Sequence, residues 1–243
     1  MGKLFGTDGI RGIVGENLTA DLAFRVGQAV GTVLMEEKGG QRPTVVLGKD
    51  TRISSDLLEA ALIAGLCSVG SDVKPVGDIP TPAVAYLTRQ EKADAGIVVS
   101  ASHNPYEHNG IKVFNSQGYK LSDALEERVE EKILSKEPMA LKTRGELGRR
   151  HHGMKRLKRD YIDFVASTID SDLAGLRILV DCANGAASAT APELFGRFKA
   201  HTVFLHRTPD GVNINDRCGS THLEDLAAQV VREGYDVGVA FDG

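Results

Sequence analysis

The feature that most constrains the fold is a repeated change of apolar period along the chain. Segments with apolar side chains every three or four residues alternate with short, nearly continuous apolar runs such as "TVVLG" (44–48), "GIVVS" (96–100) and "RILVD" (177–181). The first pattern indicates amphipathic helices, and the second indicates buried strands, because a parallel sheet is covered on both faces. We therefore predict an α/β fold with mainly parallel mixed sheets.

The same pattern predicts the individual elements. Helices are expected over 20–38, 56–70, 81–90, 123–135, 161–169, 191–198 and 223–233. Strands are expected over 44–50, 72–76, 95–101, 110–114 and 201–206, and within the runs 177–185 and 235–243. Thr19, Ser54 or Ser55, and Ser122 stand where helix N-caps are needed.

The chain length and one irregular segment predict two domains. At 243 residues the chain exceeds a typical domain of roughly 100 to 150 residues. Between Lys136 and Arg159 the apolar periodicity fades, and proline and glycine interrupt a charged stretch. We place the boundary there and predict domains over 1–150 and 151–243, each a unit of alternating strands and helices.

Composition argues against several classes of protein. No apolar run approaches the roughly 18 residues of a membrane span, and the start "MGKLFGTDGIRG" lacks the apolar segment of a secretory signal, so we expect a cytoplasmic protein without a membrane partner. The net charge of -4 does not favour nucleic acid, and the basic run 149–159 contains no aromatic residue. We interpret that run as a solvated connection between domains.

The three cysteines give no sign of a disulfide framework or a zinc site. Cys67, Cys182 and Cys218 are odd in number and widely spaced. This usage suits a reducing compartment. We interpret them as small hydrophobic residues.

Three polar segments are candidates for chemistry. Ser102 and Asp242 each follow an apolar run, and ligands of open α/β sheets bind at the carboxyl ends of the strands. The glycine-rich segment "GTDGIRG" (6–12) is interpreted as a loop whose amide groups, together with Arg11, could hold an anion.

Ser102 has three possible roles. As a hydrolase nucleophile it would need a base, but neighbouring residues of an extended backbone point to opposite sides, so His103 is poorly placed to serve. The G-x-S-x-G elbow is also missing, since Ser100 and Asn104 occupy its glycine positions. As a phosphoryl carrier, Ser102 would need cations such as Lys112 and Arg11. The third possibility is a turn or cap residue, for which the composition of this loop is also common.

Longer stretches of the sequence resemble the α-D-phosphohexomutases. They are "SASHNP" (100–105), "KLFGTDGIRG" (3–12), "VDCANGAAS" (180–188) and "GVNINDRCGSTH" (211–222). The resemblance covers essentially the whole chain. The sequence around the serine is most similar to the branch of the family that acts on glucosamine phosphates.

The resemblance implies an isomerase that interconverts glucosamine 6-phosphate and glucosamine 1-phosphate through glucosamine 1,6-bisphosphate, for UDP-N-acetylglucosamine and peptidoglycan synthesis. Ser102 would be the phosphoserine, and Arg11 and Lys112 would steady the transferring oxygens. His103 would assist at the sugar hydroxyl, and Mg²⁺ would bind the Ser102 phosphate and Asp242. Family members also form homodimers through the first domain.

Two alternatives remain beside this hypothesis. The chain could belong to a member that acts on mannose or glucose phosphates, or it could be a non-catalytic module for phosphate binding or dimerisation. The polar side chains of 211–222, among them Asn215 and His222, could contact ligand or only order their loop.

The sequence departs from the family pattern at its end. The metal loop of the family reads D-G-D-x-D-R, and this sequence ends at Asp242-Gly243. The family has four domains, and only the first two are recognisable here. We therefore expect an amino-terminal fragment that is inactive alone.

Overall fold

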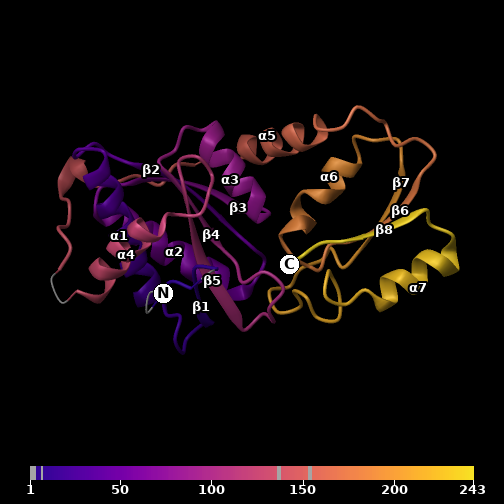
Figure 1. Cartoon of the computed structure of the whole chain (residues 1–243), viewed down its shortest axis with the longest axis horizontal. Coiled ribbons are helices and arrows are strands. Elements are labelled where there is room, and N and C mark those ends of the chain that lie inside the picture. Colours follow the sequence, from indigo (N-terminus) through magenta and orange to yellow (C-terminus); the bar gives the residue numbers. More distant parts are fainter. Residues whose placement is uncertain (1–3, 7, 136–137, 153–154) are drawn as a thin grey trace.

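The chain forms two α/β units joined by a helical connection (Figure 1). The computed structural model describes residues 4–6, 8–135, 138–152 and 155–243. The strands are β1 (Ile10–Ile13), β2 (Thr44–Lys49), β3 (Asp72–Asp78), β4 (Ala95–Val99), β5 (His108–Asn115), β6 (Arg177–Asp181), β7 (His201–Leu205) and β8 (Val237–Ala240). The helices are α1 (Ala20–Glu37), α2 (Ile53–Ser68), α3 (Thr81–Gln90), α4 (Asp123–Leu134), α5 (Lys155–Ala166), α6 (Ala191–Phe195) and α7 (Glu224–Glu233), with short 3-10 helices η1 (Arg144–Glu146) and η2 (Ala186–Ala189).

Each unit is built on one sheet. The first sheet has the strand order β1-β5-β4-β2-β3, and the second has the order β7-β6-β8. In the first sheet β2 is parallel to β3 and β4, whereas β5 is antiparallel to both β1 and β4. All strands of the second sheet are parallel. The predicted α/β class with mixed sheets is confirmed.

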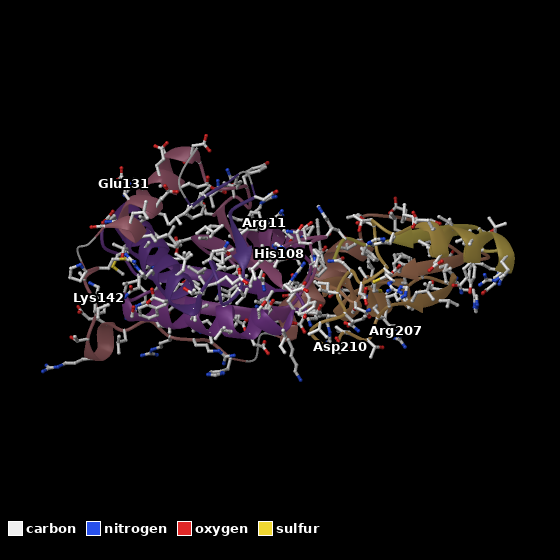
Figure 2. The ribbon with its side chains drawn as sticks, turned by 90° about the horizontal axis from the view of Figure 1, so that it is seen from below. Arg11, His108, Glu131, Lys142, Arg207 and Asp210 are labelled. Carbon is white, nitrogen blue, oxygen red and sulfur yellow. The ribbon has the colours of Figure 1, made fainter. Side chains whose placement is uncertain are left out.

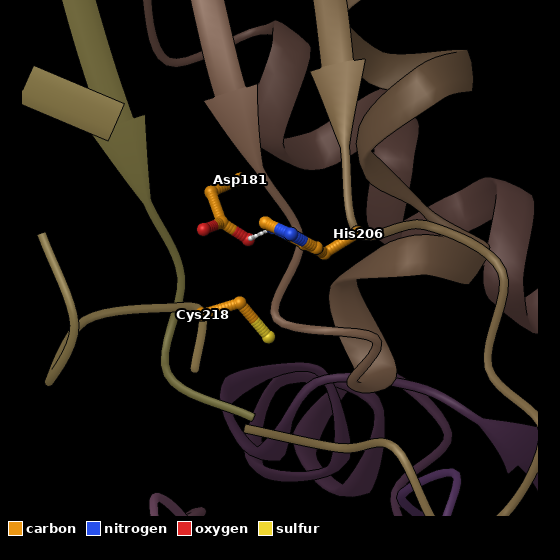
Figure 3. Close-up of side chains that lie close together, drawn as sticks. All are labelled: Asp181, His206 and Cys218. Atoms are coloured by element: carbon orange, nitrogen blue, oxygen red, sulfur yellow. Dashed lines mark ion pairs between the residues drawn. The ribbon is translucent and has the colours of Figure 1, made fainter. Parts of the chain in front are cut away.

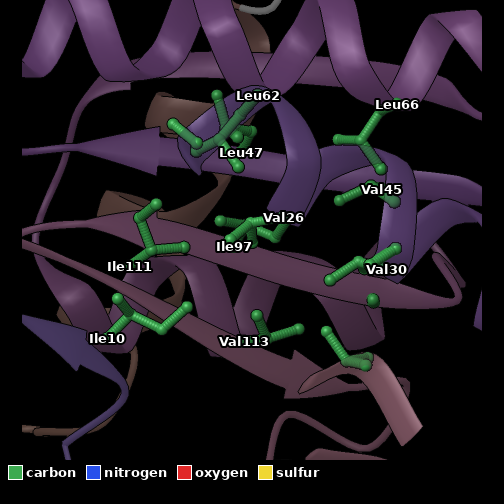
Figure 4. Packing of buried hydrophobic residues seen from close by; sticks show 14 of the residues in the cluster. Ile10, Val26, Val30, Val45, Leu47, Leu62, Leu66, Ile97, Ile111 and Val113 are labelled. Carbon is green, nitrogen blue, oxygen red and sulfur yellow. The ribbon is translucent and has the colours of Figure 1, made fainter. Parts of the chain in front are cut away.

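Helices cover both faces of the first sheet. On one face α1 and α2 pack over the central strands, and α4 packs against α1. This core is formed by the aliphatic side chains that the 3.6-residue period and the apolar runs had indicated, including Val26, Val30, Leu47, Leu62, Leu66, Ile97 and Ile111 (Figure 4). A second core lies on the other face, where α3 and α5 pack over the sheet. Burial on both faces explains the continuous apolar character of β2 and β4.

Two glycines allow α1 and α2 to approach closely. Gly65 of α2 lies against the backbone of Phe24, and Gly27 of α1 lies against the backbone of Leu62. A methyl group at either glycine would overlap with the facing carbonyl oxygen. The tight crossing therefore depends on the absence of a side chain at these two positions.

One predicted helix cap is confirmed and another is wrong. The hydroxyl of Thr19 accepts a hydrogen bond from Leu22 N at 3.1 Å and caps α1. Helix α2 begins three residues before the predicted range, with Arg52 at the N-cap, and Ser55 lies inside its first turn. The Ser55 hydroxyl donates to Asp50 at 2.8 Å instead of accepting from a backbone N–H of the helix, because a buried carboxylate is a strong hydrogen-bond acceptor. Ser122 occupies the N-cap of α4 without a side-chain cap bond.

Two further expectations about local structure are wrong. Arg11 lies in strand β1, paired with Gly110 of β5, rather than in a loop. The basic run 149–159 is only partly a connection, because α5 begins at Lys155 instead of Tyr161. Leu157 is fully buried against α3, so the basic side chains around it occupy the solvent face of an amphipathic helix.

The connection before α5 is attached to the edge of the first sheet. Arg150 forms a parallel bridge with Val73, and Arg149 N donates to Asp72 Oδ1 at 2.9 Å. Asp72 also accepts from Arg42 at 3.1 Å. Helix α5 then contacts both α3 and α6 and links the two units (Figure 1).

Cys182 and Cys218 are buried and Cys67 is partly buried, and all three are free, in agreement with the predicted role as small hydrophobic residues. In the described part of the chain, no helix is both long and apolar enough to cross a bilayer.

We predict that Gly65→Ala lowers the free energy of unfolding by about 1–3 kcal/mol, because the added methyl group forces α2 away from α1. The measurement is denaturant unfolding followed by circular dichroism. Gly145→Ala is the matched control, since a Cβ there has no neighbour within 4 Å. Equal midpoints for the two variants would contradict the close helix contact.

We also predict that Asp72 contributes to acid sensitivity. Burial raises the pKa of Asp72, but hydrogen bonds from Arg149 N, His151 and Arg42 outweigh it and hold the pKa below its ordinary value. A lowered folded-state pKa stabilises the protein above the ordinary carboxyl range near about pH 4, and this contribution is lost as the pH falls through the folded-state pKa.

Asp72→Asn should therefore lose more stability at pH 7 than at pH 3. Asp170→Asn, which changes an exposed aspartate, is the control variant. Thermal unfolding at the two pH values measures both. A loss for Asp72→Asn that is independent of pH would contradict this role.

Candidate active site

The carboxyl ends of the parallel strands in both sheets point to the junction between the units. Direct hydrogen bonds cross this junction: the Thr51 hydroxyl donates to Asn184 O at 2.6 Å, and Ile53 N donates to Gly211 O at 2.8 Å. In Figure 2, Arg11 and His108 lie in the half of the first unit that faces the second. Sequence reasoning had placed the candidate chemistry at such strand ends.

Ser102 lies at the centre of the junction, in the loop of residues 100–105 that follows β4, which we call the serine loop. Its backbone has a φ of 58°, in the left-handed region. Its hydroxyl donates to Asp242 Oδ2 at 2.6 Å, and Asp242 follows β8 of the second sheet. The two strand-end residues singled out in the sequence are thus brought together from opposite units.

His103 does not lie as predicted. The expectation of opposite side-chain directions assumed an extended backbone, but the left-handed turn at Ser102 changes the direction of the chain. Nδ1 of His103 lies 4.0 Å from Asp242 Oδ2, the same oxygen that Ser102 contacts. Both side chains therefore face one carboxylate, and among the described contacts no hydrogen bond joins Ser102 to His103. This geometry does not provide the serine–histidine pair of a hydrolase.

Arg11 and Lys112 are connected through Asp8, which sequence reasoning did not single out. Arg11 Nη1 lies 3.4 Å from Asp8 Oδ2, and Lys112 Nζ lies 3.8 Å from Asp8 Oδ1. Gly110 lies between Arg11 and the serine loop: a Cβ at this glycine would meet both Arg11 Cγ and the Ser100 carbonyl oxygen. The glycine therefore permits the close approach of a cation to the serine loop.

A cleft of about 470 Å³ opens beside Ser102. Ser102, Lys112 and Asp242 line it, and residues of α5, α6 and the start of α3 form most of the remaining wall, which is mainly apolar but includes the hydroxyl-bearing side chains of Thr81, Tyr161 and Thr190. Arg11 does not line this cleft. An acceptor hydroxyl, a cation and a carboxylate in one mostly apolar cleft are suited to bind a small phosphorylated molecule.

Sequence reasoning also missed a buried pair of residues, Asp50 and Arg52, which contacts the serine loop from within the first unit. Arg52 and Asp50 form an ion pair that is almost fully buried. Arg52 Nη2 donates to the carbonyl oxygens of Ser102 and Asn104 at 3.0 and 2.6 Å. Asp50 directly follows β2, so the strand-end rule could have identified it, but the contact of Arg52 with the serine loop depends on the sheet topology.

Asp242 and Ser102 present oxygen atoms suited to a magnesium ion. The Asp242 side chain is half exposed, and its Oδ2 is adjacent to the Ser102 hydroxyl. Mg²⁺ is commonly held by one or two carboxylates together with phosphate oxygens and water. The predicted pairing of Ser102 with Asp242 in a metal site is therefore compatible with the donors that lie here.

Asp181, His206 and Cys218 form another cluster at the ends of β6 and β7 (Figure 3). Their potential metal-ligand atoms lie within 4.8 Å of one another. Asp181 Oδ1, however, accepts from Ala183 N at 2.8 Å and lies 3.1 Å from His206 Nδ1, and Oδ2 accepts from Gly219 N at 2.9 Å. Since both carboxylate oxygens are engaged, the contacts show Asp181 joining three loops of the second unit.

The thiols near this cluster are poor nucleophiles. Burial, with a smaller contribution from Asp181, raises the pKa of Cys182 to about 12 and the pKa of Cys218 to about 11. Thiols with such values are protonated at neutral pH, and the thiolate is the reactive form.

Comparison with known proteins agrees with the observed fold. Residues 2–139 match the phosphoglucomutase/phosphomannomutase alpha/beta/alpha domain I, and residues 159–243 match the corresponding domain II. The phosphoglucosamine mutases of Acetivibrio thermocellus and Clostridium novyi are 55% and 54% identical to the chain over 244 aligned residues. All of this chain is covered, but it spans only 54% of either relative.

Solved structures extend the similarity to the backbone. A phosphoglucomutase/phosphomannomutase family protein from Burkholderia thailandensis superimposes with a TM-score of 0.81 at 28% identity, covering 99% of this chain and 52% of that protein. An N-acetylphosphoglucosamine mutase from Aspergillus fumigatus has a TM-score of 0.54 at 14% identity, covering 93% and 45%, and shares the fold. Because both domains match and relatives share more than half of their aligned residues with it, the chain belongs to the phosphoglucomutase/phosphomannomutase family.

Proposed function

We propose that the chain carries the phosphoserine half of a phosphoglucosamine mutase, in which Ser102 transfers a phosphoryl group to and from glucosamine phosphates. The observation that carries the proposal is the contact of the Ser102 hydroxyl with Asp242, at 2.6 Å, in a cleft that Lys112 also lines. Relatives named phosphoglucosamine mutase, at 54–55% identity, favour glucosamine as the sugar over glucose or mannose.

The reaction consists of two balanced transfers. In the first, the bond between phosphorus and Ser102 Oγ breaks while a bond to a hydroxyl of the sugar phosphate forms, which gives glucosamine 1,6-bisphosphate. His103 takes the proton of the attacking hydroxyl, and the leaving Ser102 Oγ takes a proton from water. After the bisphosphate reorients, Ser102 Oγ gives its proton back to water and forms a bond to the other phosphorus. The bond from that phosphorus to the sugar oxygen breaks, the sugar oxygen takes the proton held by His103, and the isomeric monophosphate leaves. In-line transfer of this kind is catalysed mainly by positioning and charge neutralisation.

The cations of the site neutralise the transferring group. Lys112 reaches the cleft from β5, and Arg11 approaches the serine loop over Gly110. The Asp8 carboxylate lies 3.4 Å from Arg11 Nη1 and 3.8 Å from Lys112 Nζ, so both cationic groups lie beside the same carboxylate. We infer that a phosphate group on Ser102 would attract both side chains, because it offers a stronger charge than one carboxylate.

Mg²⁺, held by Asp242 and an oxygen of the Ser102 phosphate, would neutralise charge that develops on the phosphoryl oxygens. Water molecules would occupy its other coordination positions. The chain alone places Asp242 against Ser102 Oγ, and we propose that this does not sustain repeated turnover.

The remaining properties follow from the same proposal. We propose that the protein acts in the cytoplasm on a soluble phosphosugar, contacts neither nucleic acid nor membrane, and dimerises through its first domain. We place the domain boundary at residue 150, in the connection that runs beside β3.

The carrier role predicts that Ser102 accepts a phosphoryl group. After incubation with glucosamine 1,6-bisphosphate and Mg²⁺, intact mass spectrometry should detect the mass of one added phosphoryl group. Ser102→Ala should abolish the gain, whereas Ser116→Ala, which changes an exposed serine, should not. An equal gain in the Ser102→Ala variant would show that another residue is the carrier. Faster labelling by the glucose or mannose bisphosphate would assign a different sugar.

Metal removal gives a second prediction. Chelation with EDTA should slow labelling of Ser102 by about a hundredfold or more, because charge stabilisation by a metal contributes several kcal/mol. In a coupled assay with glucosamine 6-phosphate, the chain alone should produce no continuing turnover. Sustained mutase activity at ordinary enzyme rates would contradict the proposed incompleteness of the site.

A further inference from the structure

We propose that Arg52 and Asn215 are positioning residues that hold Ser102 in its reactive conformation, and that Asn215 makes this conformation depend on the docking of the second unit. The inference rests on the proposed function for its chemical consequence. We call the two side chains together the serine clamp. Both donate to the same pair of acceptors, the carbonyl oxygens of Ser102 and Asn104.

The backbone of Ser102 needs such support. A non-glycine residue in the left-handed region is disfavoured by contacts of its Cβ, at a cost of order 1–3 kcal/mol. Local hydrogen bonds supply part of the compensation: Ser102 N donates to Ser100 Oγ at 3.0 Å, and Asn104 N donates to Ala101 O at 3.2 Å. Neither bond fixes the carbonyl groups, whose directions set the turn.

Arg52 fixes these carbonyl groups from the first unit. Its guanidinium group is held by the buried ion pair with Asp50, and the Ser55 hydroxyl donates to the same carboxylate at 2.8 Å. Asn109 in turn donates to Ser55 at 3.0 Å. Because the donors of a guanidinium group form a rigid planar fork, an arginine held in this way keeps two acceptors in fixed relative positions.

Asn215 fixes the same carbonyl groups from the second unit. Its Nδ2 donates to Ser102 O at 3.0 Å and to Asn104 O at 3.1 Å. The backbone of Asn215 is itself held, because its N–H donates to Ala183 O at 2.9 Å in the loop after β6. The side chain therefore extends from a fixed point of the second unit to the serine loop.

The second unit thus contacts the serine loop in two ways. Asp242 approaches the Ser102 hydroxyl, and Asn215 holds the carbonyl group of the same residue. Both contacts are present only when the two units are docked. Docking therefore orders the loop that carries Ser102 Oγ and also places the Asp242 carboxylate beside this oxygen. Separation of the two units would remove both contacts.

Asn215→Asp tests the clamp with little change of volume, since a carboxylate cannot donate to the two carbonyl groups. Asn213→Asp is the matched control, because Asn213 lies in the same loop but donates to Thr208 O instead. Hydrogen exchange of the Ser102 and Asn104 amides in the full chain measures how often the serine loop opens.

We expect exchange at these amides to become about tenfold faster in Asn215→Asp, since two hydrogen bonds are lost. Asn213→Asp should leave it unchanged. Equal exchange in the two variants would overturn the clamp.

The chemical consequence is measured by the rate at which glucosamine 1,6-bisphosphate labels Ser102. Asn215→Asp should lower the maximal rate about tenfold or more and leave the half-saturating concentration within about threefold, because positioning affects the transfer step rather than sugar binding. An unchanged maximal rate with a loosened loop would refute the positioning role. If the unmodified chain takes up no phosphoryl group, the proposed function fails, and the exchange comparison still decides the clamp.

Arg52→Lys provides an independent variant. Lysine keeps a positive charge beside Asp50 but lacks the planar fork. Loosening of the same two amides, with a native circular dichroism spectrum, would support the clamp from the first unit. Unchanged exchange in this variant would contradict the role of Arg52.

Discussion

The buried ion pair between Asp50 and Arg52 is the interaction on which the arrangement of the site depends. A buried charge pair is stabilised when further hydrogen bonds engage its remaining donors and acceptors. Here the Ser55 hydroxyl donates to the carboxylate, and the carbonyl groups of the serine loop accept from Nη2 of the guanidinium group, whose buried Nε has no hydrogen-bond partner among the described residues. The requirements of a buried charge thereby position the residue that carries the proposed chemistry.

The position of this pair follows from the sheet. Asp50 leaves the carboxyl end of β2, and the serine loop leaves the carboxyl end of β4, the parallel neighbour of β2. The antiparallel strands β5 and β1 add Lys112 and Arg11 at the same end. The mixed topology therefore places the Ser102 hydroxyl and two cations near the carboxyl end of β4.

The second unit supplies what the first lacks. Its parallel strands point their carboxyl ends at the same junction, so that Asp242 and Asn215 approach the serine loop from the opposite side. The loops that carry them are joined by Asp181, whose two oxygens accept from backbone groups of separate loops. The site is therefore a product of docking between two units, each of which is ordered by a buried aspartate.

Interactions between neighbouring residues allowed the fold class, most elements and two candidate site residues to be predicted from the sequence alone. The apolar periods gave the α/β class and most helices and strands, Thr19 gave the start of α1, and the strand-end rule selected Ser102 and Asp242. These inferences succeed because side-chain period, cap chemistry and strand ends depend on neighbouring residues. The motif "SASHNP" indicated the family, and the comparisons confirm it.

Tertiary structure alone decided the rest. Ser55 binds Asp50 instead of capping α2, Arg11 belongs to a strand, and His103 faces Asp242 because Ser102 is left-handed. Arg11 and His103 have partners that are distant in the sequence, and the local pattern carries no information about them. Asp50 is only five residues from Ser55, but both side chains are buried in the folded protein, which the local pattern does not show. The sequence thus determined which residues carry the proposed chemistry, whereas the packing of two sheets end to end decided what each of them contacts.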